Sequence, residues 1–209
     1  MDRIEALYKK SPDPSSFAKG YIDYLQEVLG RLDLAAIGDF VKTLLRARES
    51  DARIFFCGNG GSAATASHFA NDLAIGCRSG NKPFQALSLT DNLPILTALG
   101  NDYGYEEIFV QQRRTHLRPG DVVVAISASG NSPNVIKAVD YANSRGAFTV
   151  ALTGFDGGQL KRLAGLGIHV PTNKGEYGPV EDVHLILDHL VSSFLMNLCR
   201  SETRTSSPN

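Results

Sequence analysis

The chain has 209 residues, of which 43% are hydrophobic and 21% are charged, a balance typical of a single globular domain with a sizeable core. Its formal net charge of −1 gives no basis for binding nucleic acid or a membrane surface through overall charge. The sequence shows no signal peptide and no apolar run near the roughly 20 residues that cross a bilayer. Its three cysteines form no CxxC motif, so we expect a cytoplasmic protein.

The first part of the chain is predicted to be helical. Residues 1–10 form a short helix, Ser15 or Ser16 caps a second that runs to about residue 32, and Asp33 caps a third over residues 34–49. These helices carry more apolar positions than one face of a sheet needs, so we expect them to pack against another copy of the chain. The alternative is that they cover the sheet of their own subunit.

Strands and helices alternate through the rest of the chain. Strands are expected at residues 54–57, 84–89, 122–126, 148–152 and 168–170. The helices that follow them are expected from residue 63, over 93–99 and 106–117 with a loop at 100–104 between them, from 133, after 157, and over 180–199. This alternation predicts an α/β fold, a doubly wound five-stranded parallel sheet with helices on both faces. The expected organisation is an N-terminal helical segment for oligomerisation (1–50), the sheet domain (51–199) and a disordered polar tail (200–209).

A glycine loop, residues 58–62, separates the first strand from a helix that carries His68 and Asp72 on one face. A strand, a glycine loop and a helix point backbone N–H groups and a helix N-terminus at an anion. Three glycines let the backbone approach a ligand that a Cβ would obstruct. The pattern therefore favours a binding loop over the alternative, a tight turn without a ligand.

A serine loop, residues 127–132, follows the third strand and offers three hydroxyls, an amide and backbone N–H groups. These donors suit a phosphate, whose ionised oxygens only accept hydrogen bonds. No Walker lysine is present, so a nucleoside triphosphate is not expected. The alternative is a serine-rich turn that caps the next helix. Both loops leave strands at their carboxyl ends, where doubly wound sheets bind ligands.

The last helix begins with an unusual density of ionisable residues, which are Glu181, Asp182, His184, Asp188 and His189. Glu181 and Asp182 suit the positive end of the helix dipole. We expect His184 to lie at the surface or behind the residues that line a site, rather than to take part in catalysis. Asp182 and His189 lie closest to one line, while Glu181 and His189 diverge by about 80° around the helix. Spacing alone does not choose between these pairs.

Four motifs occur in the order CGNGGSAATASHFANDL, LGNDYG, ISASGNS and EDVHLILDH. Together they resemble the sugar isomerase (SIS) domain family, and within it most closely the phosphoheptose isomerases. The resemblance covers nearly the whole chain, to about residue 198. It implies a flavodoxin-like sheet, a homotetramer, and an aldose–ketose isomerase of heptose biosynthesis that converts sedoheptulose 7-phosphate to D-glycero-D-manno-heptose 7-phosphate.

The resemblance also implies roles for individual residues. The implied substrate-binding residues are Asn59, Gly60, Gly61, Asn101, Asp102, Ser127, Ala128, Ser129 and Ser132. Asp72 is implied as the catalytic base and His189 as the acid, with Glu181 assisting the base. One zinc or other divalent ion per site is implied, with the ligands His68, Asp72, Glu181 and His189. The alternative is that these side chains only hydrogen-bond the hydroxyls of the sugar.

Three residues depart from the pattern of the family. Asp72 stands where glutamate is usual, Glu181 where glutamine is usual, and Ala128 where threonine is usual. The first change shortens the base, the second adds a negative charge and the third removes a hydroxyl. We expect the first two changes to compensate each other, with Glu181 supplying the reach that Asp72 lacks.

Two other functions compete with this interpretation. A non-catalytic SIS adaptor, similar to the replication-initiator-associating protein of bacteria, keeps the fold but not the ionisable site, and the four predicted metal ligands argue against it. A dinucleotide enzyme fits the loose fingerprint of Gly58, Gly60 and Ala63. However, Asp91 follows too late for that fingerprint, and the serine loop stays unexplained.

Overall fold

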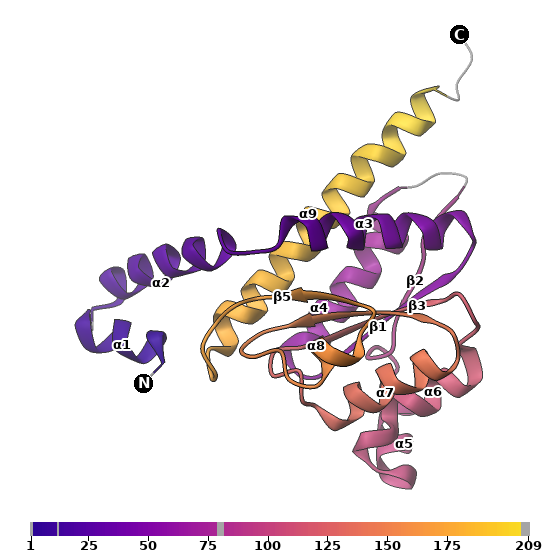
Figure 1. Cartoon of the computed structure of the whole chain (residues 1–209), viewed down its shortest axis with the longest axis horizontal. Coiled ribbons are helices and arrows are strands. Elements are labelled where there is room, and N and C mark those ends of the chain that lie inside the picture. The colour runs from indigo at the N-terminus through magenta and orange to yellow at the C-terminus, as the bar shows by residue number, and fades with distance from the viewer. Residues whose placement is uncertain (1, 12, 79–81, 206–209) are drawn as a thin grey trace.

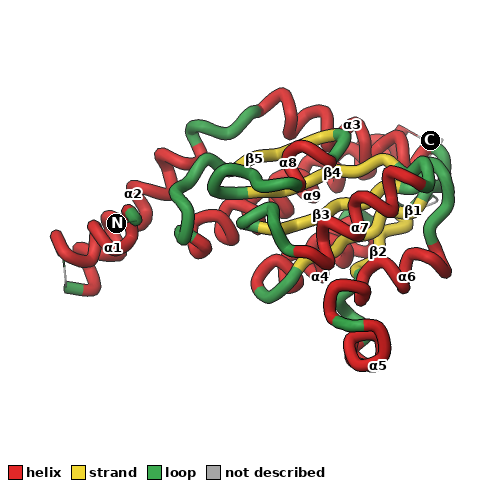
Figure 2. Tube along the Cα trace, turned by 60° about the horizontal axis from the view of Figure 1, so that its bottom comes forward, coloured by secondary structure: helices red, strands yellow, loops and turns green. Residues whose placement is uncertain are grey.

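The computed structural model describes residues 2–11, 13–78 and 82–205. Its sheet is parallel throughout, and the strands lie in the order β2-β1-β3-β4-β5 (Figure 2). The strands are β1 Arg53–Gly58, β2 Gln85–Ser88, β3 Val122–Ser127, β4 Phe148–Thr153 and β5 Leu166–His169. This flavodoxin-like order confirms the predicted fold. The chain reverses its winding direction between β1 and β3, where such sheets bind ligands.

Helices cover both faces of the sheet, as the apolar runs of the strands require. The helices are α1 Arg3–Lys10, α2 Pro14–Leu29, α3 Leu34–Glu49, α4 Gly61–Asn71, α5 Leu93–Tyr103, α6 Ile108–His116, α7 Pro133–Ser144, α8 Leu160–Leu163 and α9 Tyr177–Thr205. Neighbouring residues of one strand serve opposite faces. Phe56 packs into a core formed with α3, α4 and α9, whereas Phe55 packs into the core formed with α6, α7 and α8. Because α4 and α9 share a face, residues far apart in sequence lie side by side (Figure 1).

The helix boundaries confirm some predictions and correct others. The third helix begins and ends as predicted, and the Asp33 side chain caps it. The second helix is capped by Asp13, which accepts a hydrogen bond from the Ser16 N–H at 3.0 Å, so the prediction of Ser15 or Ser16 was wrong. The reason is Pro14, which takes the first helical position, where its fixed φ is favourable and its missing N–H costs nothing.

Two helices are longer than the sequence predicted. Helix α5 continues into the expected loop at 100–104 as far as Tyr103, and Gly104, whose φ of +91° favours glycine, follows its end. Helix α9 runs through Thr205, so residues 200–205 are helical rather than disordered, and residues 206–209 lie outside the described residues. An ion pair of 2.9 Å between Arg48 and Glu202 joins this end of α9 to α3.

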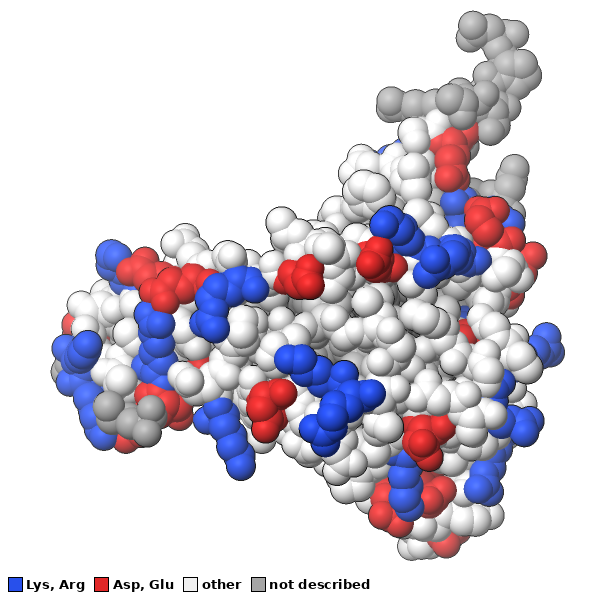
Figure 3. Space-filling model, in the orientation of Figure 1, with Lys and Arg blue, Asp and Glu red and all other residues white. Residues whose placement is uncertain are grey.

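The N-terminal helices α1 and α2 extend away from the body of the molecule (Figure 1). Tyr21 of α2 still reaches α9, where its hydroxyl donates a hydrogen bond of 2.5 Å to Asp182. The N-terminal helices also expose apolar side chains, among them Ile22 of α2, which is 55% exposed, and Leu34 at the start of α3. Lysine and arginine alternate with acidic residues on the face shown in Figure 3. Within the described residues, no helix is both long and apolar enough to span a membrane.

Candidate active site

The glycine loop lies at the carboxyl end of β1 and leads directly into α4. Gly60 takes a φ of +54° at the N-terminus of this helix, a conformation that favours glycine. Asn59 is fixed by two hydrogen bonds exchanged with the Asn134 amide and by one from the Tyr105 hydroxyl, each 2.9 Å long. The loop lines a pocket of about 460 Å³ together with residues of α5 and α6.

Asn101 and Asp102 lie on the exposed last turn of α5 and are joined by a hydrogen bond of 2.9 Å. They do not line the pocket beside the glycine loop, although Gly100 and Tyr105 do. The structure therefore brings Asn59 and Gly60 together at this pocket but leaves Asn101 and Asp102 outside its lining.

The serine loop lies at the carboxyl end of β3, the strand beside β1. The Ser127 hydroxyl is 3.3 Å from that of Ser132 and 3.5 Å from that of Ser129. Ser132 occupies the N-cap position of α7, but its side chain makes no capping hydrogen bond. The capping alternative therefore does not account for this hydroxyl. It lies against the Ser127 hydroxyl instead, and such a group of hydroxyls suits an anion.

Hydrogen bonds from the segment that follows β4 fix the backbone of the serine loop. The Gly154 N–H donates to the Ala128 carbonyl at 2.9 Å, and the Leu160 N–H donates to the Gly130 carbonyl at 3.0 Å. Gly130 has a φ of +63°, and a Cβ there would overlap the Gly157 carbonyl. The loop is therefore preformed, with its hydroxyls already gathered before a ligand binds.

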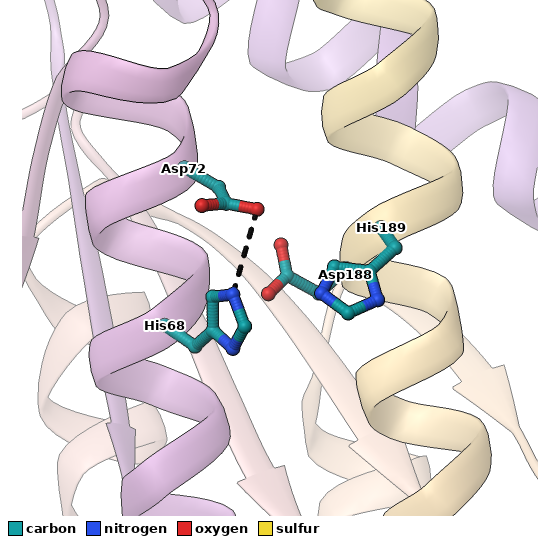
Figure 4. A group of neighbouring side chains, drawn as sticks. All are labelled: His68, Asp72, Asp188 and His189. Carbon is teal, nitrogen blue, oxygen red and sulfur yellow. Dashed lines mark ion pairs between the residues drawn. The ribbon is translucent and has the colours of Figure 1, made fainter.

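A second group of polar side chains lies between α4 and α9 and is called here the α4–α9 cluster. It consists of His68, Asp72, Asp188 and His189, whose potential ligand atoms all lie within 4.8 Å of one another. The His68 Nε2 is 3.7 Å from the Asp72 Oδ2, and the two imidazole rings are 4.9 Å apart between centroids. In Figure 4, His68 and Asp72 point toward α9, and Asp188 points back toward them.

The backbone geometry at Asp72 helps to place it in the cluster. Helix α4 ends at Asn71, and a π-helical turn, η1 Asp72–Gly76, continues from it. Such turns widen a helix locally and are frequent at functional sites. Asp72 also accepts a hydrogen bond of 3.4 Å from the Ser192 hydroxyl of α9. The cluster is thus held by contacts from both helices.

Asp188 is the functional candidate that the sequence analysis missed. It is 0% exposed, and burial, together with the negative charge of Asp72, raises the pKa of its carboxyl to about 7. The buried face of α9 is otherwise mainly apolar, with Val183, Leu187 and Val191 beside it. A carboxylate in the register of those positions is the signal that would have identified it.

The structure does not bring Glu181 into the cluster. Its carboxylate lies against Gly61 at the start of α4, so a Cβ on Gly61 would overlap it. Burial, and then the neighbouring charge of Asp182, raise the pKa of Glu181. Of the four predicted metal ligands, three are together, and Asp188 stands where Glu181 was expected.

Asp182 and His184, the other two ionisable residues in the first part of α9, lie outside the cluster. Asp182 accepts the hydrogen bond from Tyr21 described above, so it joins α2 to α9. His184 is fully buried, and burial lowers its pKa to about 4. Of the two positions expected for His184, the surface is wrong, because α9 packs on the sheet with that face inward, and a position behind the site stays a prediction.

Comparison with known proteins assigns the family. Residues 20–154 match the SIS domain. The chain belongs to the SIS domain family. It is similar to the phosphoheptose isomerase of Rhodospirillum rubrum, at 39% identity over 75% of this chain and 82% of that protein. It is also similar to that of Akkermansia muciniphila, at 46% identity over 66% of this chain and 72% of that protein.

A solved structure supports the same assignment. The phosphoheptose isomerase GmhA of Neisseria gonorrhoeae has a TM-score of 0.75 and 35% identity, and the likeness covers 87% of this chain and 95% of that one. The resemblance to phosphoheptose isomerases that the four motifs indicated is confirmed over most of the SIS-domain chain.

Proposed function

We propose that this protein is a sugar-phosphate isomerase that converts sedoheptulose 7-phosphate to D-glycero-D-manno-heptose 7-phosphate. The observation that carries the proposal is the α4–α9 cluster, two imidazoles and two carboxylates gathered on helices that begin near the sheet edge where the serine loop lies. Relatives named phosphoheptose isomerase support the choice of substrate. The non-catalytic adaptor leaves this cluster without a role.

The distance from the glycine loop to the α4–α9 cluster suits a long substrate. His68 and Asp72 follow Gly61 by 7 and 11 residues along the chain, which corresponds to roughly 10–16 Å along a helix axis. Helical side chains lean toward the N-terminus, here toward the glycine loop, which shortens this distance. An extended seven-carbon sugar phosphate is roughly 10 Å long, given bonds of about 1.5 Å. A sugar phosphate held at the glycine loop is therefore long enough for its far end to reach toward His68 of the cluster.

The reaction removes a proton beside a carbonyl and returns one at the neighbouring carbon. Asp72 serves as the base, since a carboxylate beside the sugar can accept the first proton. His189 is the most exposed member of the cluster, and its imidazole donates or relays the second proton. Glu181, which lies against the glycine loop, assists by binding the hydroxyls of the sugar.

The cluster fits the zinc or other divalent ion that the family resemblance implies. Two imidazoles and two carboxylates are suitable donors for such an ion. Four tetrahedral ligand atoms around zinc lie roughly 3.4 Å apart, so the widest pair, at most 4.8 Å apart, must close slightly. When bound, the ion would stabilise the negative oxygen of the enediolate.

The proposed assembly is a homotetramer, in which the N-terminal helices pack between subunits. The exposed Ile22 and Leu34 support this role, because isolated apolar helices gain stability by packing. A cytoplasmic location is also proposed, and it is supported by the free cysteines Cys57, Cys77 and Cys199, all of which are buried and reduced.

A turnover assay with sedoheptulose 7-phosphate tests the proposal directly. We expect the aldose product to appear with the purified full-length protein and to increase with added zinc. Fructose 6-phosphate, a shorter ketose phosphate, is the matched control and should turn over much more slowly. Absence of any product from sedoheptulose 7-phosphate, with and without zinc, would contradict the proposal and favour the adaptor.

A further inference from the structure

The carboxylate of Asp188 is buried between α4 and α9. Asp188 is 0% exposed, and neither of its carboxylate oxygens has a hydrogen-bond partner among the described residues. Burying an ionised carboxylate is strongly unfavourable unless it is paired, hydrogen-bonded or bound to a metal. Asp188 therefore occupies a position that a bound cation would explain.

The surroundings of Asp188 are suited to such a cation. Asp188 points toward α4 (Figure 4), and its ligand atom lies within 4.8 Å of those of His68, Asp72 and His189. Asp72 adds a second negative charge close to the first, which repels it. Two carboxylates and two neutral imidazoles together balance the charge of a divalent ion, so a bound ion removes both the repulsion and the unpaired charge.

Glu181 is poorly placed for the same role. It precedes Asp188 by seven residues, which is roughly 10 Å along the axis of a helix. Its carboxylate lies against Gly61, at the beginning of α4, while the cluster surrounds the end of that helix. The carboxylates of Glu181 and Asp188 therefore serve opposite ends of the α4–α9 interface.

We infer that Asp188, and not Glu181, is the fourth ligand of a divalent metal ion that His68, Asp72 and His189 also bind. This inference deepens the proposed function and rests on it for the class of ion. Glu181 is left free to act at the glycine loop. In this chain the fourth ligand on α9 is therefore Asp188, the residue directly before His189, rather than Glu181.

Equilibrium metal binding tests the inference without depending on turnover. The full-length protein is stripped of metal with a chelator and titrated with Zn²⁺ by calorimetry, and with Co²⁺, whose visible absorption reports the coordination number. The Asp188→Asn variant keeps the shape of the side chain and removes its charge. Losing a ligand exceeds the 10–100-fold effect of changing an outer partner, so we expect Asp188→Asn to weaken Zn²⁺ binding by on the order of 100-fold or more.

The matched control is Glu181→Gln, which neutralises the other carboxylate of the same helix. We expect Zn²⁺ affinity and the Co²⁺ spectrum to remain close to those of the wild type. Circular dichroism of the metal-free proteins checks folding, and Asp188→Leu, apolar like its neighbours on α9, provides a second variant. It should fold and should also lose the Zn²⁺ site.

The outcomes separate this inference from the proposed function. Loss of binding in Glu181→Gln with retention in Asp188→Asn overturns the ligand assignment. A wild-type protein that isomerises the sugar but binds no Zn²⁺ overturns it too, and leaves the proposed function in place. The expected pattern of binding without isomerisation supports the ligand assignment and contradicts the proposed function.

Discussion

The serine loop and the α4–α9 cluster differ in how far their own residues satisfy the polar groups that they bring together. The serine loop is fixed by backbone hydrogen bonds from Gly154 and Leu160, and its hydroxyls lie 3.3–3.5 Å apart. In the cluster, the buried Asp188 has no hydrogen-bond partner among the described residues. The serine loop, the proposed phosphate site, is therefore preformed, whereas the α4–α9 cluster, the proposed site of chemistry, leaves room for a bound ion to satisfy Asp188.

Chemistry and binding should therefore be separable by mutation, and the largest effect is expected at the cluster. Asp72→Asn removes the proposed base while keeping the size of the side chain. Proton transfer by a positioned group contributes about 10²–10⁴-fold to a rate, so kcat should fall by that order. Steady-state kinetics with sedoheptulose 7-phosphate measure it. Asp91→Asn, an acidic residue outside the cluster, is the control and should keep its turnover.

A fall in pH is expected to lower the free energy of unfolding through the buried His184 of α9 before it affects the serine loop. The pKa of the buried His184 is lowered from 6.5 to about 4, so the unfolded chain binds more protons between these values. The stability contributed above pH 6.5 is lost as pH falls toward 4, by about 3 kcal/mol. Denaturant unfolding across this range, compared with His184→Gln, measures it.

The same comparison also controls for Asp188. Its pKa is raised, so its contribution to stability changes with pH in the opposite direction to that of His184. This contribution is present in both proteins and cancels. Equal slopes of stability against pH in the wild type and His184→Gln would show that the burial of His184 does not carry the effect.

A smaller effect is expected in the serine loop. Ser129→Ala removes one hydroxyl of the proposed phosphate site, and a hydrogen bond to a charged group contributes about 1.5–3 kcal/mol. Calorimetric titration should show weaker binding of the sugar phosphate by that amount, and adding Ser132→Ala should weaken it further. Ser144→Ala, at the far end of α7, is the control. Unchanged affinity in the double variant would refute the phosphate assignment.

The smallest expected change is a gain in thermal stability on metal binding. An ion that binds only the folded chain at 100 times its Kd stabilises it by about 2.7 kcal/mol, and at ten times its Kd by about 1.4 kcal/mol. Scanning calorimetry with and without Zn²⁺ should show the shift in the wild type. The shift should disappear in His68→Ala, whereas a shift of equal size there would place the ion elsewhere.

The two regions also differ in how well the sequence predicts them. The strands and the serine loop are predicted closely, because apolar runs bounded by Gly, Pro and Asp are local signals. Helix α3 and its Asp33 cap are predicted to the residue for the same reason. Helix α5 was predicted too short, since Gly100 reads as a breaker but lies inside the helix.

The cluster is predicted only in part. His68, Asp72 and His189 were identified through the family resemblance, but Asp188 was not. Its role depends on which face of α9 packs on α4, and a helical period does not specify the partner helix. Glu181 was assigned to the cluster by its position in the motif, whereas the approach of α9 to Gly61 places it at the glycine loop.

The central claim is that the serine loop binds the substrate and the cluster transforms it. The most direct test measures affinity and turnover of sedoheptulose 7-phosphate in parallel for the wild type and His189→Ala. We expect His189→Ala to retain calorimetric binding of the sugar phosphate, within about threefold, and to lose the 10²–10⁴-fold that acid–base catalysis contributes to turnover. Full turnover by His189→Ala, or loss of binding and turnover together, would contradict it.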